Sequence, residues 1–195
     1  GMILSSCSKD EPDPDAGKID PSTIATANLI GYWAFEDSPK DAITDKGTAN
    51  GNVTYVTGRR GKAYKGADNS YITWDVALTD KIATLHGYTI ALWMKSPKTS
   101  GGPPMIFMIT GTEFLGSLAF FQENNGDNLS DSLALKAFFT KKGALDKDGN
   151  PGWVGHDWYK SKKEFVADLW FHLAINYDPA ISKAKVYITG NYLFT

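Results

Sequence analysis

Hydrophobic and polar positions alternate with a period of two along several short stretches of the chain. In Tyr88–Lys95 every second residue from Tyr88 to Met94 is apolar, and Thr, Ala, Trp and Lys stand between them. Trp170–Tyr177 repeats the alternation, with an apolar set that starts at Phe171 and a mixed set that includes His172. Residues two positions apart share one face of a β-strand. Both stretches are therefore predicted to be half-buried antiparallel strands with one oily face.

The rest of the chain also contains short apolar runs, which are separated by clusters of Gly, Asn, Asp and Pro. These residues tolerate the backbone conformations that tight turns need. The predicted strands are Leu29–Glu36, Asn52–Thr57, Lys62–Lys65, Tyr71–Trp74, Tyr88–Lys95, Met105–Thr110, Ser117–Gln122, Ser132–Phe139, Leu169–Tyr177 and Ala184–Thr189. About ten short strands predict an all-β fold, an antiparallel two-sheet sandwich or jelly roll with almost no helix. Trp33, Trp93 and Trp170 lie within these strands and are predicted to be core residues.

Composition narrows the function classes. Apolar residues make up 42% of the chain and charged residues 22%, which is typical of a globular protein. The net charge of −2 gives no basic excess for nucleic acid, so no nucleic-acid partner is predicted. A single cysteine excludes a disulfide framework and a cysteine-cluster metal site.

The N-terminal segment has a different character from the rest. Leu-Ser-Ser-Cys, ending at Cys7, resembles the lipobox of bacterial lipoproteins, in which the cysteine carries lipid. Residues 9–23 are acidic and broken by prolines, a composition that does not order itself and is typical of a tether. Residues 1–27 are predicted to be a trimmed signal remnant and flexible tether, and residues 28–195 one β-sandwich domain. The alternative for Cys7 is a free cysteine in a flexible tail.

Six segments between residues 29 and 190 carry short motifs in a fixed order. They are Leu29–Asp37, followed by Asp41; Tyr55–Ala63, with Gly-Arg-Arg-Gly-Lys-Ala; Tyr71–Trp74; Tyr88–Lys95; Trp170–Asp178, with Trp-Phe-His-Leu-Ala; and Lys185–Gly190, with Val-Tyr-Ile-Thr-Gly. In order and spacing they resemble the laminin-G-like branch of the concanavalin A-like lectin/glucanase superfamily. The lipobox beside such a domain resembles glycan-handling surface lipoproteins of Bacteroidetes. The resemblance implies a concanavalin A-like jelly roll at the outer membrane or cell surface, anchored only through lipid on Cys7.

One departure from the family concerns the C-terminal end. The family continues past the Val-Tyr-x-x-Gly hairpin with strands that close the sandwich, whereas here five residues follow Gly190. Either the final strand or strands are missing, or the topology is completed differently. A sheet edge left open invites pairing with another chain, so a homo-oligomer formed through that edge is one expectation.

Catalysis is the first function to weigh, because the superfamily includes glycoside hydrolases. Such enzymes place two carboxylates across the scissile bond. The resemblance implies a Glu-x-Asp-x-Glu strand in retaining glucanases, and the chain has no such motif. No catalytic residue is predicted, and a diverged hydrolase is kept as the alternative.

A calcium site is a second candidate. Asp146, Asp148 and Asn150 space oxygen ligands as the start of an EF-hand loop does, although Pro151 stands where its sharp-turn glycine belongs. The other interpretation is a polar hairpin turn. The resemblance adds loop positions that hold a cation in the family, at Asp178 and, less directly, Asp68 and Asn69.

The third candidate is the segment 151–160, interpreted as a long loop. Loop aromatics with polar neighbours suit sugars, because a pyranose ring offers C–H faces for stacking and hydroxyls for hydrogen bonds. The predicted ligand-binding residues are Trp153, His156, Asp157, Trp158 and Tyr159. The alternative is a loop that folds back and buries its tryptophans. The leading hypothesis is a non-catalytic carbohydrate-binding module of a surface lipoprotein, with a glycan or a surface protein as partner; a hydrolase and a structural or protein-interaction module are the alternatives.

Overall fold

The computed structural model describes residues 23–75, 77, 80–97, 104–110, 118–123, 134–139, 148–149, 156–160, 167–188 and 191–194. Two compact units make up the chain, Gly1–Leu85 and His86–Thr195. All paired strands in the described part are antiparallel, and its longest helical element is the short 3-10 helix η2 (Lys81–Thr84). The prediction of an antiparallel all-β protein with almost no helix is confirmed.

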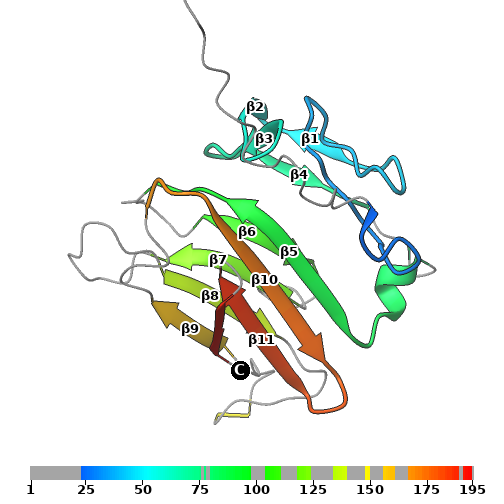
Figure 1. The fold of residues 1–195 in the computed structure, drawn as a ribbon, viewed down its shortest axis with the longest axis vertical. Helices are drawn as coiled ribbons and strands as arrows, with labels where there is room; N and C mark the ends of the chain where they lie inside the picture. The colour runs from blue at the N-terminus through cyan, green and yellow to red at the C-terminus, as the bar shows by residue number, and fades with distance from the viewer. Residues whose placement is uncertain are drawn as a thin grey trace, which may run out of the picture. The chain divides into compact units, whose positions relative to one another are not determined.

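Two four-stranded sheets form the second unit (Figure 1). One has the order β12-β11-β10-β5 and the other β6-β7-β8-β9. Their strands are β5 (Tyr88–Met94), β6 (Met105–Ile109), β7 (Leu118–Glu123), β8 (Ala134–Phe139), β9 (His156–Lys160), β10 (Phe171–Asp178), β11 (Lys183–Ile188) and β12 (Asn191–Phe194). Two of these, β9 and β12, were not predicted from the sequence.

A single apolar cluster joins the two sheets of the second unit. Its buried members come from β7, β8, β10 and β11: Leu118, Phe120, Leu135, Phe171, Leu173, Ile175, Val186 and Ile188. Apolar residues of β5 and β6 pack against the cluster while partly buried. Because both sheets contribute their inner faces to one core, the arrangement is sandwich-like.

The predicted alternation holds in β5 and β10. Phe171, Leu173 and Ile175 are buried, whereas the residues between them are only half-buried. Leu173 of β10 lies opposite Leu92 of β5, so the apolar residues of the two strands are paired on the same face of the sheet. This register places the mixed faces of both strands together on the side of the sheet away from the core.

The described part of the first unit contains four short strands, the helix η2 and a tight loop. β1 (Thr48–Asn50) pairs with β4 (Tyr71–Thr73), and β2 (Thr54–Thr57) pairs with β3 (Lys62–Lys65). The loop of residues 38–46 winds around one side chain, that of Asp41, which is fully buried. We call this segment the Asp41 loop.

The Asp41 carboxylate accepts four hydrogen bonds. One oxygen accepts from the backbone N–H groups of Tyr32 and Ile43, and the other accepts from the N–H and hydroxyl of Thr44, at 2.8 and 2.6 Å. A buried carboxylate is stable when donors of this kind replace its hydration. The main chain adds two closures, from Asp41 N–H to the Lys46 carbonyl and from Asp45 N–H to the Asp41 carbonyl. Asp41 is therefore a structural acceptor that holds the loop closed.

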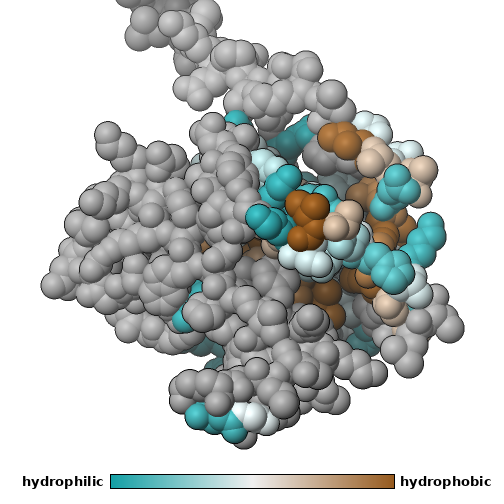
Figure 2. All heavy atoms as spheres, turned by 90° about the horizontal axis from the view of Figure 1, so that it is seen from below, coloured by the Kyte–Doolittle hydropathy of each residue, from teal (hydrophilic) through white to brown (hydrophobic). Residues whose placement is uncertain are grey.

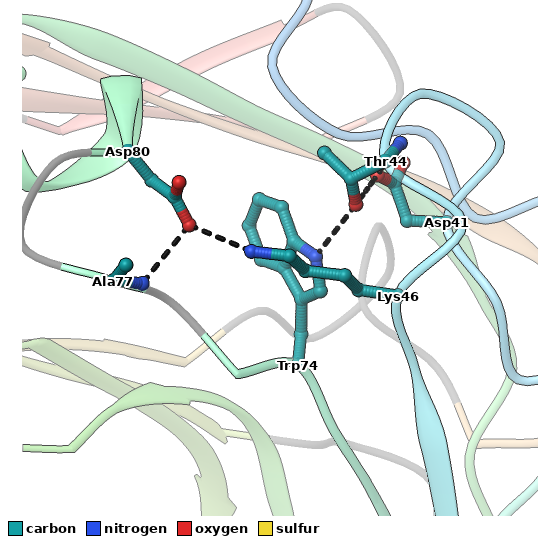
Figure 3. Close-up of polar contacts among 6 residues, drawn as sticks. All are labelled: Asp41, Thr44, Lys46, Trp74, Ala77 and Asp80. Atoms are coloured by element: carbon teal, nitrogen blue, oxygen red, sulfur yellow. Dashed lines mark hydrogen bonds and ion pairs between the residues drawn. The ribbon is translucent and has the colours of Figure 1, made fainter.

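The Asp41 loop is connected to β4 and η2 by polar contacts (Figure 3). The Trp74 indole N–H donates to the Thr44 hydroxyl at 3.0 Å, and the Lys46 ammonium donates to the Asp80 carboxylate at 2.9 Å. The Lys46 bond, followed by the bond from the Ala77 N–H, holds the pKa of Asp80 below its ordinary value. Trp74 also packs edge-on against Trp33, with ring centroids 4.7 Å apart.

The predicted opening strand Leu29–Glu36 is wrong, because none of its residues is assigned to a strand. The Tyr32 N–H donates to the Asp41 carboxylate and the Tyr32 carbonyl accepts from Ala42, so these groups do not enter a sheet ladder. Phe35 and Asp37 adopt positive φ values of 58° and 55°, which a strand does not contain. Two of its aromatic rings instead contact rings of other segments, Trp33 that of Trp74 and Phe35 that of Tyr64.

Two further sequence predictions concern the ends of the chain. Cys7 and residues 1–22 of the predicted tether lie outside the described part, whereas residues 23–27 are described and exposed, and the division at residue 27 stays a prediction. Near the other end, β12 adds a fourth strand beside β11, with a register shift between Val186 and Tyr187.

Within the described residues, no helix is long and apolar enough to cross a membrane.

Candidate functional site

One surface of the second unit gathers aromatic and polar side chains that are exposed or half-buried on the outer side of a sheet. It is the outer face of β5, β10 and β11, opposite the apolar core. We call it the aromatic face, and its residues are Thr89, Ala91, Trp93, Lys95, Trp170, His172, Ala174, Asn176, Asp178, Lys183, Lys185 and Tyr187. Strand pairing fixes the order of these residues, so the face is preorganised by the fold.

Trp93 and His172 form the centre of the aromatic face. They lie directly opposite each other on β5 and β10, and their ring centroids are 5.3 Å apart at an angle of 60°. Trp93 is 42% exposed, although large aromatic side chains usually bury most of their surface. Lys95 continues the face beside them, with its ammonium 5.7 Å from the centroid of the Trp170 ring. An indole ring exposed on a sheet can stack on an apolar ligand surface.

Partial burial sets the protonation of His172. Desolvation lowers the pKa of this imidazole below its ordinary value. The ring is therefore neutral near pH 7, where one nitrogen donates a hydrogen bond and the other accepts one. Beside Trp93, this gives the face a donor and an acceptor next to an apolar ring.

Paired residues of β5, β10 and β11 form rows across this face, and a polar row lies two rows from the Trp93–His172 pair. Asn176 lies opposite Thr89 on one side and Lys185 on the other. Its amide nitrogen donates to the Thr89 hydroxyl at 2.9 Å, which fixes the orientation of the amide. The row between holds Ala91 and Ala174, the smallest side chains of the face, opposite Tyr187. An apolar ring, small side chains and oriented polar groups thus follow one another along the sheet.

The sequence-predicted ligand segment has a different structure from the one expected. Trp153 lies outside the described residues, but His156–Lys160 is the strand β9 at the edge of the second sheet, so the prediction of a loop there is wrong. Hydrogen bonding to β8 makes it a strand, with Trp158 opposite Lys136 and Tyr159 opposite the core residue Leu135.

This register separates the predicted ligand residues. Neighbouring positions of a strand belong to opposite faces. His156 and Trp158 therefore belong to one face of the sheet, and Asp157 and Tyr159 to the other. Trp158 and Tyr159 therefore do not share one face of the strand, so the two together are not expected to form a single stacking platform.

The predicted calcium site stays a prediction, because the structure describes only two of its four residues, Asp148 and Asp178. Asp146 and Asn150 lie outside the described residues, and the described Asp148 is exposed. The Asp178 carboxylate accepts the Ala180 N–H at 2.9 Å, which caps the turn between β10 and β11. Within the described part of the chain, no three acidic, histidine or cysteine residues come together as metal ligands. Asp68, one of the positions implied by the family resemblance, likewise belongs to no such group.

The sequence assigned Trp93 to the core, and that assignment is wrong. The signal that would have corrected it is the alternation itself, because Trp93 occupies the phase of Thr89 and Ala91 rather than that of Ile90 and Leu92. His172, which the alternation places in the mixed set of its strand, lies on the outer face. What the sequence did not reveal is that β5 and β10 are neighbours in a register that sets Trp93 against His172.

Comparison with known proteins yields no match for this chain, whether with protein-family models, with curated proteins or with solved structures. The family resemblance drawn from the motifs therefore stays a prediction.

Proposed function

We propose that this chain is a non-catalytic carbohydrate-binding module that holds its ligand on the aromatic face. The observation that carries the proposal is the exposed Trp93 ring beside His172, on the outer side of a sheet whose inner side forms the core. The finer expectations belong to the same proposal: a concanavalin A-like jelly roll, lipid on Cys7, and a place at the bacterial outer membrane or cell surface.

The chemistry of a sugar fits this arrangement. A pyranose ring presents C–H groups on its faces and hydroxyls around its rim, so it needs an apolar platform with polar groups beside it. Trp93 supplies the platform and neutral His172 both donates and accepts. The amide oxygen of Asn176 accepts no hydrogen bond from a described residue, which leaves an oriented acceptor for a hydroxyl.

Two alternatives rank lower for stated reasons. Hydrolysis needs two carboxylates on either side of the glycosidic bond, and among the described residues of the aromatic face only Asp178 is acidic. A protein-interaction module would be expected to expose a broad apolar patch. Over the described residues drawn in Figure 2, hydrophobic and hydrophilic side chains are interspersed on the side seen from below. Pairing of two copies through an open sheet edge is compatible with glycan binding and stays a separate expectation.

A glycan screen followed by calorimetric titration tests the proposal. The full chain is first applied to immobilised glycans, and the strongest binder is then titrated with wild type, Trp93→Ala and the control Tyr71→Ala. Tyr71 is 56% exposed on β4 of the first unit and is not a residue of the aromatic face, so it matches the loss of an exposed ring.

Trp93→Ala is expected to weaken binding by about 1–2 kcal/mol, or roughly five- to thirty-fold, the scale of a truncated aromatic anchor. Tyr71→Ala should bind like wild type. Both variants should keep the far-UV circular dichroism spectrum of wild type. A screen in which no glycan is retained, or a Trp93→Ala variant that binds as tightly as wild type, would overturn the proposal.

A further inference from the structure

The aromatic face carries more positive than negative charge. Its described cationic residues are Lys95, Lys183 and Lys185, and its one described carboxylate belongs to Asp178. None of the three lysines forms an ion pair with a described residue, whereas Lys40, Lys46 and Lys62 of the first unit each do. The chain as a whole has a net charge of −2, so the excess of lysine is a local property of this face.

Lys95 is the lysine closest to the proposed stacking platform. It follows Trp93 by two residues, and alternate residues of a strand lie roughly 7 Å apart on one face. Its ammonium lies 5.7 Å from the centroid of the Trp170 ring. A cation–π contact holds an ammonium in place without neutralising its charge, so the cation remains available to an anion.

Lys185 provides a second cation on the other side of the face. It lies opposite Asn176, in the row where the amide is oriented by Thr89. Asp178, the one described carboxylate of the face, lies one row further, opposite Lys183. Lys95 and Lys185 therefore flank the Trp93–His172 pair along the sheet, and no described carboxylate lies between them. His172 adds no positive charge of its own, because burial keeps its imidazole neutral near pH 7.

From this arrangement we propose that the aromatic face selects glycans that carry anionic groups, either uronate carboxylates or sulfate esters. The inference rests on the proposed function, since it names the ligand class of the same site. Stacking on Trp93 would position a sugar whose carboxylate or sulfate meets the ammonium of Lys95, and Lys185 would meet a second anionic group further along the chain of sugars.

The test compares matched ligands. An oligogalacturonate is titrated beside its carboxyl-reduced form, which has the same linkage and length but no charge, and beside a sulfated galactan oligosaccharide. The proteins are wild type, Lys95→Gln and the control Lys65→Gln. Lys65 is an exposed lysine at the end of β3, so its replacement makes the same change of charge outside the face.

Wild type is expected to prefer at least one anionic ligand over the neutral one. Lys95→Gln should lose about two- to five-fold in affinity for that ligand, the range of one partly exposed ion pair, and should keep its affinity for the neutral ligand. The preference should shrink as salt is raised, because exposed charges are screened. Lys65→Gln should behave as wild type. Preference for the oligogalacturonate or for the sulfated galactan identifies the carboxylate or the sulfate as the recognised group.

Equal binding of the neutral and anionic ligands overturns the inference and leaves the proposed function standing. A preference that survives Lys95→Gln unchanged overturns the assignment to this face. Failure of all three oligosaccharides, together with an empty glycan screen, overturns the proposed function and the inference with it.

Discussion

Replacing Asp41 by alanine removes the acceptor of four hydrogen bonds in the first unit. Three of the donors are backbone N–H groups, of Tyr32, Ile43 and Thr44, and the fourth is the Thr44 hydroxyl. The four bonds are part-buried and the carboxylate is fully buried, so water replaces the lost acceptor only in part.

Hydrogen bonds to a charged group contribute about 1.5–3 kcal/mol each, and partial rehydration reduces their sum. Asp41→Ala is expected to lower the free energy of unfolding by about 3–5 kcal/mol, close to the largest values seen for single substitutions. Asp41→Asn keeps one acceptor oxygen but turns an amide donor toward the Thr44 N–H, so a loss of about 2 kcal/mol is expected. The asparagine variant is the more informative one, since it preserves the shape of the side chain.

The assay is equilibrium unfolding in urea, followed by tryptophan fluorescence. Trp74 reports on the loop directly, because its indole donates to the hydroxyl of Thr44. Asp45→Asn is the matched control, since it makes the same chemical change four residues away. Asp45 pairs with Lys40 at the surface, where a salt bridge contributes at most about 1 kcal/mol. The reasoning is refuted if Asp41→Asn costs no more than Asp45→Asn.

Three smaller predictions follow from the same structure. Gly61→Ala should cost about 1–2 kcal/mol in urea unfolding, because a residue with a Cβ is strained at φ +52° and this Cβ would collide with the Glu36 carboxylate; an unchanged midpoint would contradict this. The pKa of His172 is lower in the folded protein than in the unfolded chain, so the unfolded chain binds the proton at a higher pH. Stability should therefore fall as the pH drops below about 6.5. Melting curves of the His172→Gln variant, recorded from pH 8 to 5, should lack this loss of stability. Burial, and then the nearby Tyr177, raise the pKa of Tyr88 to about 12. Stability should therefore decline between the unfolded pKa of 10.0 and about 12, and a Tyr88→Phe variant that declines as steeply as wild type over that range would count against the assignment.

Period-two patterning predicted β5 and β10 correctly because each of them has one face in an apolar core. The packing of Phe171, Leu173 and Ile175 repeats every two residues, and the sequence records that repeat directly. Leu29–Glu36 is likewise rich in apolar residues, yet its backbone bonds with the Asp41 loop. Alternation reports which side chains are apolar, and it does not report which groups accept the main-chain hydrogen bonds.

The candidate site required information that the sequence does not contain. The alternation placed His172 on the mixed face of its strand, but Trp93 was assigned to the core because it lies within a predicted strand. The contact between them depends on the pairing of two strands that lie more than seventy residues apart along the chain. Similarly, β9 was taken for a loop because its polar ends and aromatic centre resemble a binding loop, and only its register with β8 assigns its residues to two faces.

The most direct test of the account is to follow the tryptophan indole N–H signals by NMR while an oligosaccharide from the glycan screen is added. The chain has six tryptophans, and single Trp→Phe variants assign their signals. The account predicts that the signals of Trp93 and Trp170 shift as the site fills, while those of Trp33 and Trp74 stay in place. Shifts confined to Trp153 and Trp158 would instead assign the ligand to the segment first favoured by the sequence and would contradict the aromatic face as the binding surface.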